Sequence, residues 1–177
     1  VMIYPEWNVN GICQEPGVER TTQVTTLAQV LKDNGYHTIH CGKAHFGANN
    51  TPGEDPLKMG FEVNIAGHAA GSPASYYGKE NFGNKPDGKS PLAAVPGLEK
   101  YHGTDTFLSE ALTLEAEKTL NNAQKSDKPF FLYMAHYAVH TPIQPDLRFY
   151  QKYIDKGLPP VEAAYATLIE GMDKSLG

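Results

Sequence analysis

The stretch of sequence that decides the fold is residues 27–47, LAQVLKDNGYHTIHCGKAHFG. Its helical apolar stripe consists of Leu27, Val30 and Leu31. A hydroxyl at Thr21 or Thr22 can cap this helix, and Asn34-Gly35 is typical of a left-handed helix end. The β-branched and aromatic residues of 36–41 then predict a strand. Helix, tight glycine turn and strand together form half of an α/β unit.

A second apolar run, residues 130–135 (FFLYMA), predicts a parallel strand that is buried on both faces, because it shows no polar alternation. It follows a predicted helix at about 106–124, for which Thr104-Asp105 offers the cap. Two shorter helices are expected near 146–154 and 160–175. We therefore expect an α/β fold with a mostly parallel sheet.

Between these two units lies a stretch rich in glycine and proline, at about residues 48–104, which shows no helical or strand periodicity. A structureless loop of this length is unusual in a compact domain and is usually functional or disordered. Its tyrosines and phenylalanines argue against disorder. We expect a folded excursion that covers a site.

The bulk composition excludes several classes of protein. The chain has 177 residues, which suits one domain, and its net charge of −5 provides no basic footprint for nucleic acid. No stretch reaches the roughly 20 apolar residues of a membrane-spanning helix, and the first residues lack the pattern of a signal peptide. Cys13 and Cys41 fit no metal-ligand spacing, and two unpaired thiols are favoured over a disulfide.

Cationic residues follow each of the two predicted strands. Lys43 and His45 come after the first strand, and His140 comes after the second, where Pro142 restrains the loop. Ligands of open α/β sheets bind beyond the carboxyl ends of the strands. A lysine and histidines at that edge would receive a tetrahedral anion and neutralise charge during sulfuryl or phosphoryl transfer. Taken singly, each is more often a solvated lysine or an ordinary loop histidine.

An ordered series of motifs resembles the sulfatase family over nearly the whole chain. The motifs are GYHT (35–38) leading into GKAHFG (42–47), then GFEVNIAG (60–67), PFFLY (129–133), HTP (140–142) and YATLIEGMD (165–173). Any one of them could arise by chance, whereas the complete set in this order is specific.

The resemblance implies an α/β/α sandwich of alkaline-phosphatase-like type, of which residues 1–177 would be the central, truncated part. It also implies a formylglycine nucleophile and a divalent metal, usually Ca²⁺. Lys43 would contact a sulfate oxygen and the formylglycine, and His45 would interact with the formylglycine hydroxyl. His140 would bind sulfate and is the candidate acid that protonates the leaving alcohol.

The chain departs from the family pattern at the nucleophile and at the metal. The first family signature, C/S-x-P-x-R, is not matched by Cys13-Gln14-Glu15-Pro16, because the proline comes one place late and no arginine follows as required. The aspartate pair and the Asp-Asn pair that bind the metal in the family are also absent. We expect the nucleophile and all of the metal ligands to lie outside this chain. The chain alone is therefore expected to be inactive.

The resemblance further implies hydrolysis of sulfate monoesters, with a sulfated small molecule or polysaccharide as partner and a periplasmic or secreted location. His68 and His136, with Tyr76 and Tyr77, could reach a sugar or aryl group, although a structural role is favoured for each. Two alternatives stay open: a phosphodiesterase or phosphonate hydrolase of the same superfamily, and a non-catalytic anion-binding module.

Overall fold

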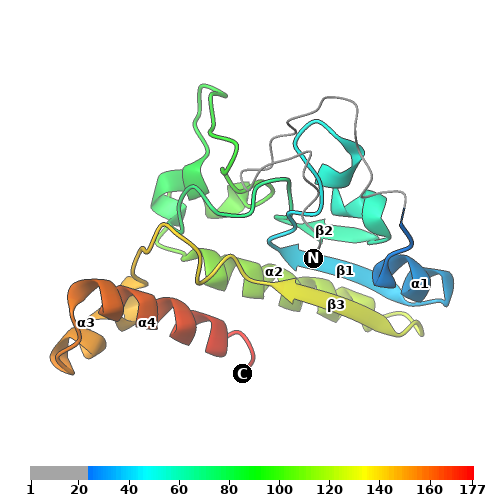
Figure 1. Ribbon diagram of the computed structural model, residues 1–177. Coiled ribbons are helices and arrows are strands. Elements are labelled where there is room, and N and C mark those ends of the chain that lie inside the picture. Colours follow the sequence, from blue (N-terminus) through cyan, green and yellow to red (C-terminus); the bar gives the residue numbers. More distant parts are fainter. Residues whose placement is uncertain (1–23) are drawn as a thin grey trace.

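The computed structural model describes residues 24–177. Within them lies a parallel sheet in the order β2-β1-β3, shown in Figure 1. Its strands are β1 (His37–Gly42), β2 (Val63–Ile65) and β3 (Phe130–Ala135). The α/β class and the parallel sheet are therefore as expected from the sequence. Because all strands run the same way, their carboxyl ends meet at one edge of the sheet.

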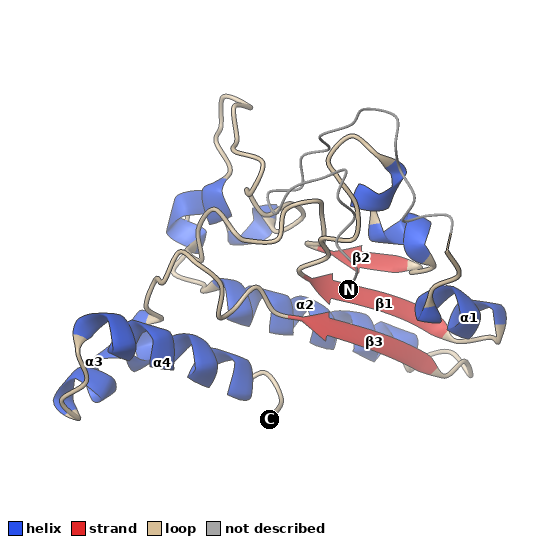
Figure 2. Ribbon diagram, in the orientation of Figure 1, coloured by secondary structure: helices blue, strands red, loops and turns tan. Residues whose placement is uncertain are grey.

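One face of the sheet is covered by α2 (Leu108–Ala123), which lies behind the strands in Figure 2. Ile39 and Cys41 of β1 are fully buried in the same cluster as Leu112. The Cys41 thiol donates to the Leu112 carbonyl oxygen at 3.4 Å. This layer is the main hydrophobic core, and its removal from water is the chief stabilising term.

The opposite face carries α1 (Leu27–Asp33) and an aromatic cluster around His40. The ring of His40 is fully buried and lies 5.3 Å from Phe61 and 5.7 Å from Tyr133, between ring centroids. Burial lowers the pKa of His40 to about 4, so the ring is neutral at pH 7. With α1 on one face and α2 on the other, the sheet is the middle of three layers.

The N-cap and the burial of α1 differ from what the sequence predicted. Thr26 is the N-cap of α1, where its hydroxyl accepts from the Gln29 amide at 3.0 Å; Thr21 and Thr22 lie outside the described residues. The predicted apolar stripe is largely exposed, with 64% of Leu27 accessible, and Ala28 is the buried residue instead. A seven-residue helix makes too small a contact with the sheet to bury a full stripe.

The expectation that residues 130–135 are buried on both faces was wrong. Phe130 and Tyr133 are each 42% exposed, because β3 is the edge strand of the described sheet. The cap predicted for α2 was also wrong. Its N-cap is Phe107, which makes no side-chain cap, and the Thr104 hydroxyl donates to the Tyr101 carbonyl instead.

The stretch 48–104 is folded, but it is not a single excursion. Its residues Val63–Ile65 form β2, a strand of the central sheet that is too short to show a periodicity. The remainder forms loops and 3-10 turns that lie above the sheet in Figure 1. These turns are η2 (Pro52–Glu54), η3 (Pro56–Met59), η4 (Gly78–Gly83) and η5 (Glu99–Tyr101).

The two helices expected at the end of the chain are present as α3 (Leu147–Asp155) and α4 (Pro160–Asp173), which pack against each other. α4 also contacts α2 and so continues that layer. In residues 24–177 no helix has the length and apolar content needed to cross a membrane.

Candidate functional site

Lys43 lies at the point where β1 and β3 stop pairing. The last paired residues are Gly42 and Ala135, and the Lys43 amide donates to the Ala135 carbonyl at 2.7 Å. Gly42 has a φ of +103°, and a side chain there would overlap the Ala135 carbonyl oxygen. Glycine is therefore required for the close approach that fixes the backbone of Lys43 at the sheet edge.

His45 is held by contacts from the excursion. Its φ is +57°, an uncommon conformation for a residue with a side chain. Its amide donates to the His68 carbonyl at 3.0 Å. The imidazole packs directly against Gly71, where an added methyl group would lie 2.5 Å from His45 Nδ1. The ring position of His45 thus depends on a glycine 26 residues later in the chain.

His68, a candidate substrate-binding residue, has both ring nitrogens within hydrogen-bond distance of protein atoms. Nε2 lies 3.2 Å from the Leu92 carbonyl, and Nδ1 lies 2.9 Å from the Tyr137 hydroxyl. Burial is the main reason that the pKa of His68 is lowered, which favours the neutral ring. In this arrangement the His68 ring links the excursion to the loop after β3.

His140 is exposed on the loop after β3. Its Nδ1 lies 3.0 Å from the Thr141 carbonyl oxygen and 3.2 Å from the Thr141 hydroxyl oxygen. Because both contacts engage Nδ1, Nε2 is the nitrogen available to a ligand. The backbone of His140 is fixed on both sides, because its amide donates to the Tyr137 carbonyl at 3.0 Å and its own carbonyl accepts from the Tyr76 hydroxyl at 2.9 Å.

His136, the second candidate for substrate binding, contacts the end of α4. Its Nε2 lies 2.7 Å from the Ser175 hydroxyl oxygen, whose proton goes to the Met172 carbonyl. Nε2 is therefore the donor, and Nδ1 carries the lone pair. Nδ1 is buried and has no hydrogen-bond partner within residues 24–177. Burial lowers the pKa of His136, so the neutral ring is favoured.

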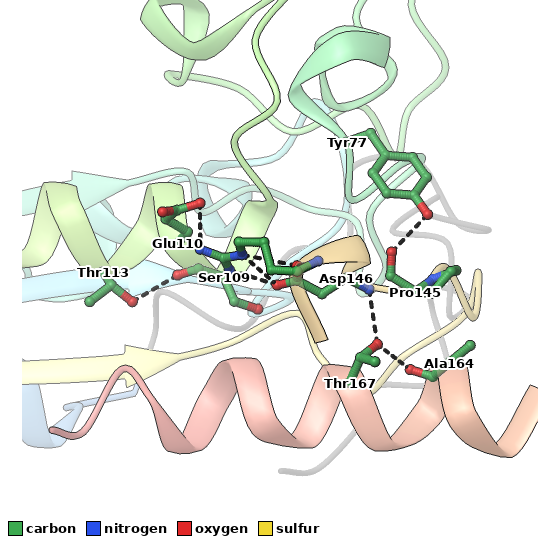
Figure 3. Close-up of polar contacts among 9 residues, drawn as sticks. Tyr77, Ser109, Glu110, Thr113, Pro145, Asp146, Ala164 and Thr167 are labelled. Atoms are coloured by element: carbon green, nitrogen blue, oxygen red, sulfur yellow. Dashed lines mark hydrogen bonds and ion pairs between the residues drawn. The ribbon is translucent and has the colours of Figure 1, made fainter. Parts of the chain in front are cut away.

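The far end of the loop after β3 is anchored by the polar contacts of Figure 3. The Tyr77 hydroxyl donates to the Pro145 carbonyl at 2.8 Å, and the Asp146 amide donates to the Thr167 hydroxyl at 2.9 Å. Asp146 is almost fully buried and accepts from the Arg148 guanidinium at 2.6 Å. The loop that carries His140 is therefore attached to the excursion, to α3 and to α4.

The described residues do not fit the metal or the nucleophile that the family implies. Between residues 24 and 177, no three His, Cys, Asp or Glu side chains are grouped so that they could hold a metal ion. Cys41 faces α2 in the core, and burial raises the pKa of its thiol to about 12, so it cannot supply a thiolate nucleophile. Cys13 lies outside the described residues.

The structure thus brings Lys43, His45 and His140 to loops that leave the same edge of the sheet. It turns the rings of His68 and His136 toward protein groups. Sequence reasoning missed the residues that hold these loops together, above all Tyr137 and Gly71. No local pattern marks either one, because their partners lie tens of residues away in the chain.

Comparisons with known proteins identify the family of the chain. The chain matches the profile of the Sulfatase family over residues 4–177. It is 28% identical to a sulfatase of Formosa agariphila over 96% of this chain and 35% of that protein. It is 30% identical to an arylsulfatase of Klebsiella aerogenes over 70% of this chain and 26% of that protein. The chain therefore spans about a third or less of these relatives.

Two solved structures have the same fold. Ps i-CgsB, in complex with k-i-k-neocarrahexaose, superposes with a TM-score of 0.72 and 24% identity, over 95% of this chain and 38% of that one. The PsFucS1 sulfatase from Pseudoalteromonas sp. gives a TM-score of 0.54 and 16% identity, over 90% of this chain and 35% of that one. At these identities the likeness concerns the fold alone.

Proposed function

The chain belongs to the sulfatase family, and from this premise we propose that the protein of which it is part hydrolyses sulfate monoesters. The observation that carries the proposal is the common origin of Lys43, His45 and His140 at the carboxyl edge of β1 and β3. Three nitrogen donors at the edge where α/β sheets bind ligands suit a tetrahedral oxyanion.

Each of the three residues has a distinct part in the proposed reaction. The Lys43 ammonium group neutralises charge on the sulfate oxygens as the S–O bond breaks. His140, when protonated, gives the Nε2 proton to the leaving alcohol oxygen. His45 holds the nucleophile in place. We propose that this nucleophile is a formylglycine outside the described residues, which would supply the attacking oxygen, and that Ca²⁺ or another divalent cation would be held by ligands that also lie outside them.

A sulfated carbohydrate is the substrate class that we propose. Support comes from the fold neighbour Ps i-CgsB, which was solved with the oligosaccharide k-i-k-neocarrahexaose. A periplasmic or secreted location is proposed with it, because a polysaccharide is met outside the cytoplasm. Cell fractionation of the source organism, with the activity measured in each fraction, tests the location.

The test uses the full-length protein with a sulfated oligosaccharide and an aryl sulfate. Lys43→Ala and His140→Ala are each expected to lower kcat by on the order of 10²-fold or more, as does loss of a transition-state charge partner. Lys58→Ala and His37→Gln serve as matched controls. Lys58 is an exposed lysine, and His37 lies at the opposite, amino end of β1. The two control variants should keep near-wild-type rates. Equal rates in all four variants would show that Lys43 and His140 do not have the assigned roles.

The same assay separates the alternatives. Faster turnover of an aryl phosphodiester or phosphonate ester than of the sulfate ester would show that the protein is a phosphodiesterase or phosphonate hydrolase and not a sulfatase. Binding of inorganic sulfate without turnover of any ester would indicate a non-catalytic anion-binding module.

The chain by itself is predicted to be inactive, because the described residues supply neither nucleophile nor metal site. Purified residues 1–177 should show no release of sulfate from an aryl sulfate. Turnover that co-purifies with the chain and disappears in Lys43→Ala would contradict this.

A further inference from the structure

We propose that two buried tyrosines, Tyr76 and Tyr137, are positioning residues that set the separation between His45 and His140. The proposal rests on the proposed function of those histidines. It is carried by a continuous series of hydrogen bonds that runs from one histidine to the other, through both tyrosine hydroxyl groups.

The first half of the series joins the loop after β1 to the loop after β3. The amide of His45 donates to the carbonyl of His68 at 3.0 Å. The ring Nδ1 of His68 lies 2.9 Å from the Tyr137 hydroxyl, which also lies 2.8 Å from the Ala66 carbonyl. Tyr137 therefore holds two points of the segment that fixes His45.

The second half joins Tyr137 to His140. The Tyr76 hydroxyl oxygen lies 2.9 Å from each of two carbonyl oxygens, those of Tyr137 and His140, and donates its single proton to this pair. The amide of His140 also donates to the Tyr137 carbonyl at 3.0 Å. Tyr76, which belongs to the excursion, thus binds both ends of the turn from Tyr137 to His140.

Neither tyrosine can act on a substrate directly. Tyr76 is 0% exposed and Tyr137 is 1% exposed. The ring of Tyr76 stacks on Phe107 with centroids 5.4 Å apart, and its amide donates to the Gln144 side chain at 2.7 Å. These contacts place the ring independently of the hydroxyl, so a phenylalanine fits the same space and removes only the hydrogen bonds.

The need for such a device follows from the topology. His45 and His140 come from separate strands, and each lies on a loop that the sheet ladder no longer holds. His45 also has a left-handed φ, which persists only when its surroundings enforce it. Because misplacement of a catalytic group by about 1 Å can cost 10²-fold in rate, the cross-link between the loops has a direct effect on the chemistry.

The test compares Tyr76→Phe and Tyr137→Phe in the full-length protein with Tyr101→Phe as the matched control. Tyr101 also loses one hydrogen bond, 2.8 Å to Glu115, but it lies outside the series. We expect kcat to fall by about 10-fold or more in each test variant with KM changed by less than about 3-fold. The control should keep the wild-type kcat at a similar loss of thermal stability.

The double variant gives a second, independent readout. If the two hydroxyls act in one series, either break releases the same constraint, so the double variant should lose about as much kcat as the worse single variant. Losses that multiply would mean two unrelated structural effects and would overturn the proposal. So would a wild-type kcat in both single variants.

Crystal structures of the variants test the positioning role of the two tyrosines independently of the proposed enzymatic activity. The spacing of the His45 and His140 rings should change in both Phe variants and not in Tyr101→Phe. If the wild-type protein hydrolyses no sulfate ester, the proposed function fails, and this spacing still decides the positioning role. An unchanged spacing in both variants would sink the proposal whatever the activity.

Discussion

Gly71→Ala is expected to displace the ring of His45 with little effect on folding. A methyl group at position 71 would lie 2.5 Å from His45 Nδ1 and 2.7 Å from its Cε1. Favourable contacts between such atoms lie near 3.5 Å, so the ring must move by about 1 Å. A catalytic group misplaced by that amount can lose about 10²-fold in rate. We therefore expect kcat/KM of the full-length protein to fall by about that factor.

The assay is steady-state hydrolysis of a sulfate ester, with urea unfolding of the same variants. Gly171→Ala is the matched control, because an added methyl group in this last turn of α4 would meet its nearest neighbour at 3.7 Å, an ordinary contact. The mechanism is isolated by adding Gly71→Ala to a His45→Ala background, where it should have no further effect. A kcat/KM within about 3-fold of wild type in the single variant, or a further large loss in the double, would refute the reasoning.

Two further predictions concern stability. Gly42→Ala should lower the free energy of unfolding by about 3 kcal/mol, because it combines a positive φ with overlap on the Ala135 carbonyl; a loss below about 0.5 kcal/mol in urea titration would contradict this. The unfolded chain protonates His40 below about pH 6.5, while the folded chain does so only below about pH 4. His40 therefore contributes stability that is present above pH 6.5 and is lost, by roughly 3 kcal/mol, as the pH falls to 4. His40→Gln should flatten that part of the curve of unfolding free energy against pH, and an unchanged slope would show that His40 is not the cause.

Local sequence signals were reliable where short-range physics controls the structure. The Asn34-Gly35 end of α1, the run that forms β3 and the bounds of α3 and α4 all follow from periodicity and turn chemistry. The same signals failed on burial. The β3 run is apolar enough for a strand covered on both faces, yet its exposure depends on which elements lie beside it.

For the candidate site, too, the sequence predicted some features and missed others. Residue type and position after a predicted strand were enough to single out Lys43, His45 and His140, because the carboxyl ends of parallel strands share one edge. The supports of these residues could not be found this way. Gly71 matters only because the His45 ring lies against it, and β2 is a strand only because β1 pairs with it.

What the sequence alone determined is therefore the α/β class, the family and the identity of the cationic residues, since each is encoded in short motifs and local spacing. The tertiary structure alone decided how those residues are held. The connection from His45 through His68, Tyr137 and Tyr76 to His140 joins segments up to 95 residues apart in the chain. Such contacts depend on long-range packing around the sheet, and no local pattern in the sequence records them.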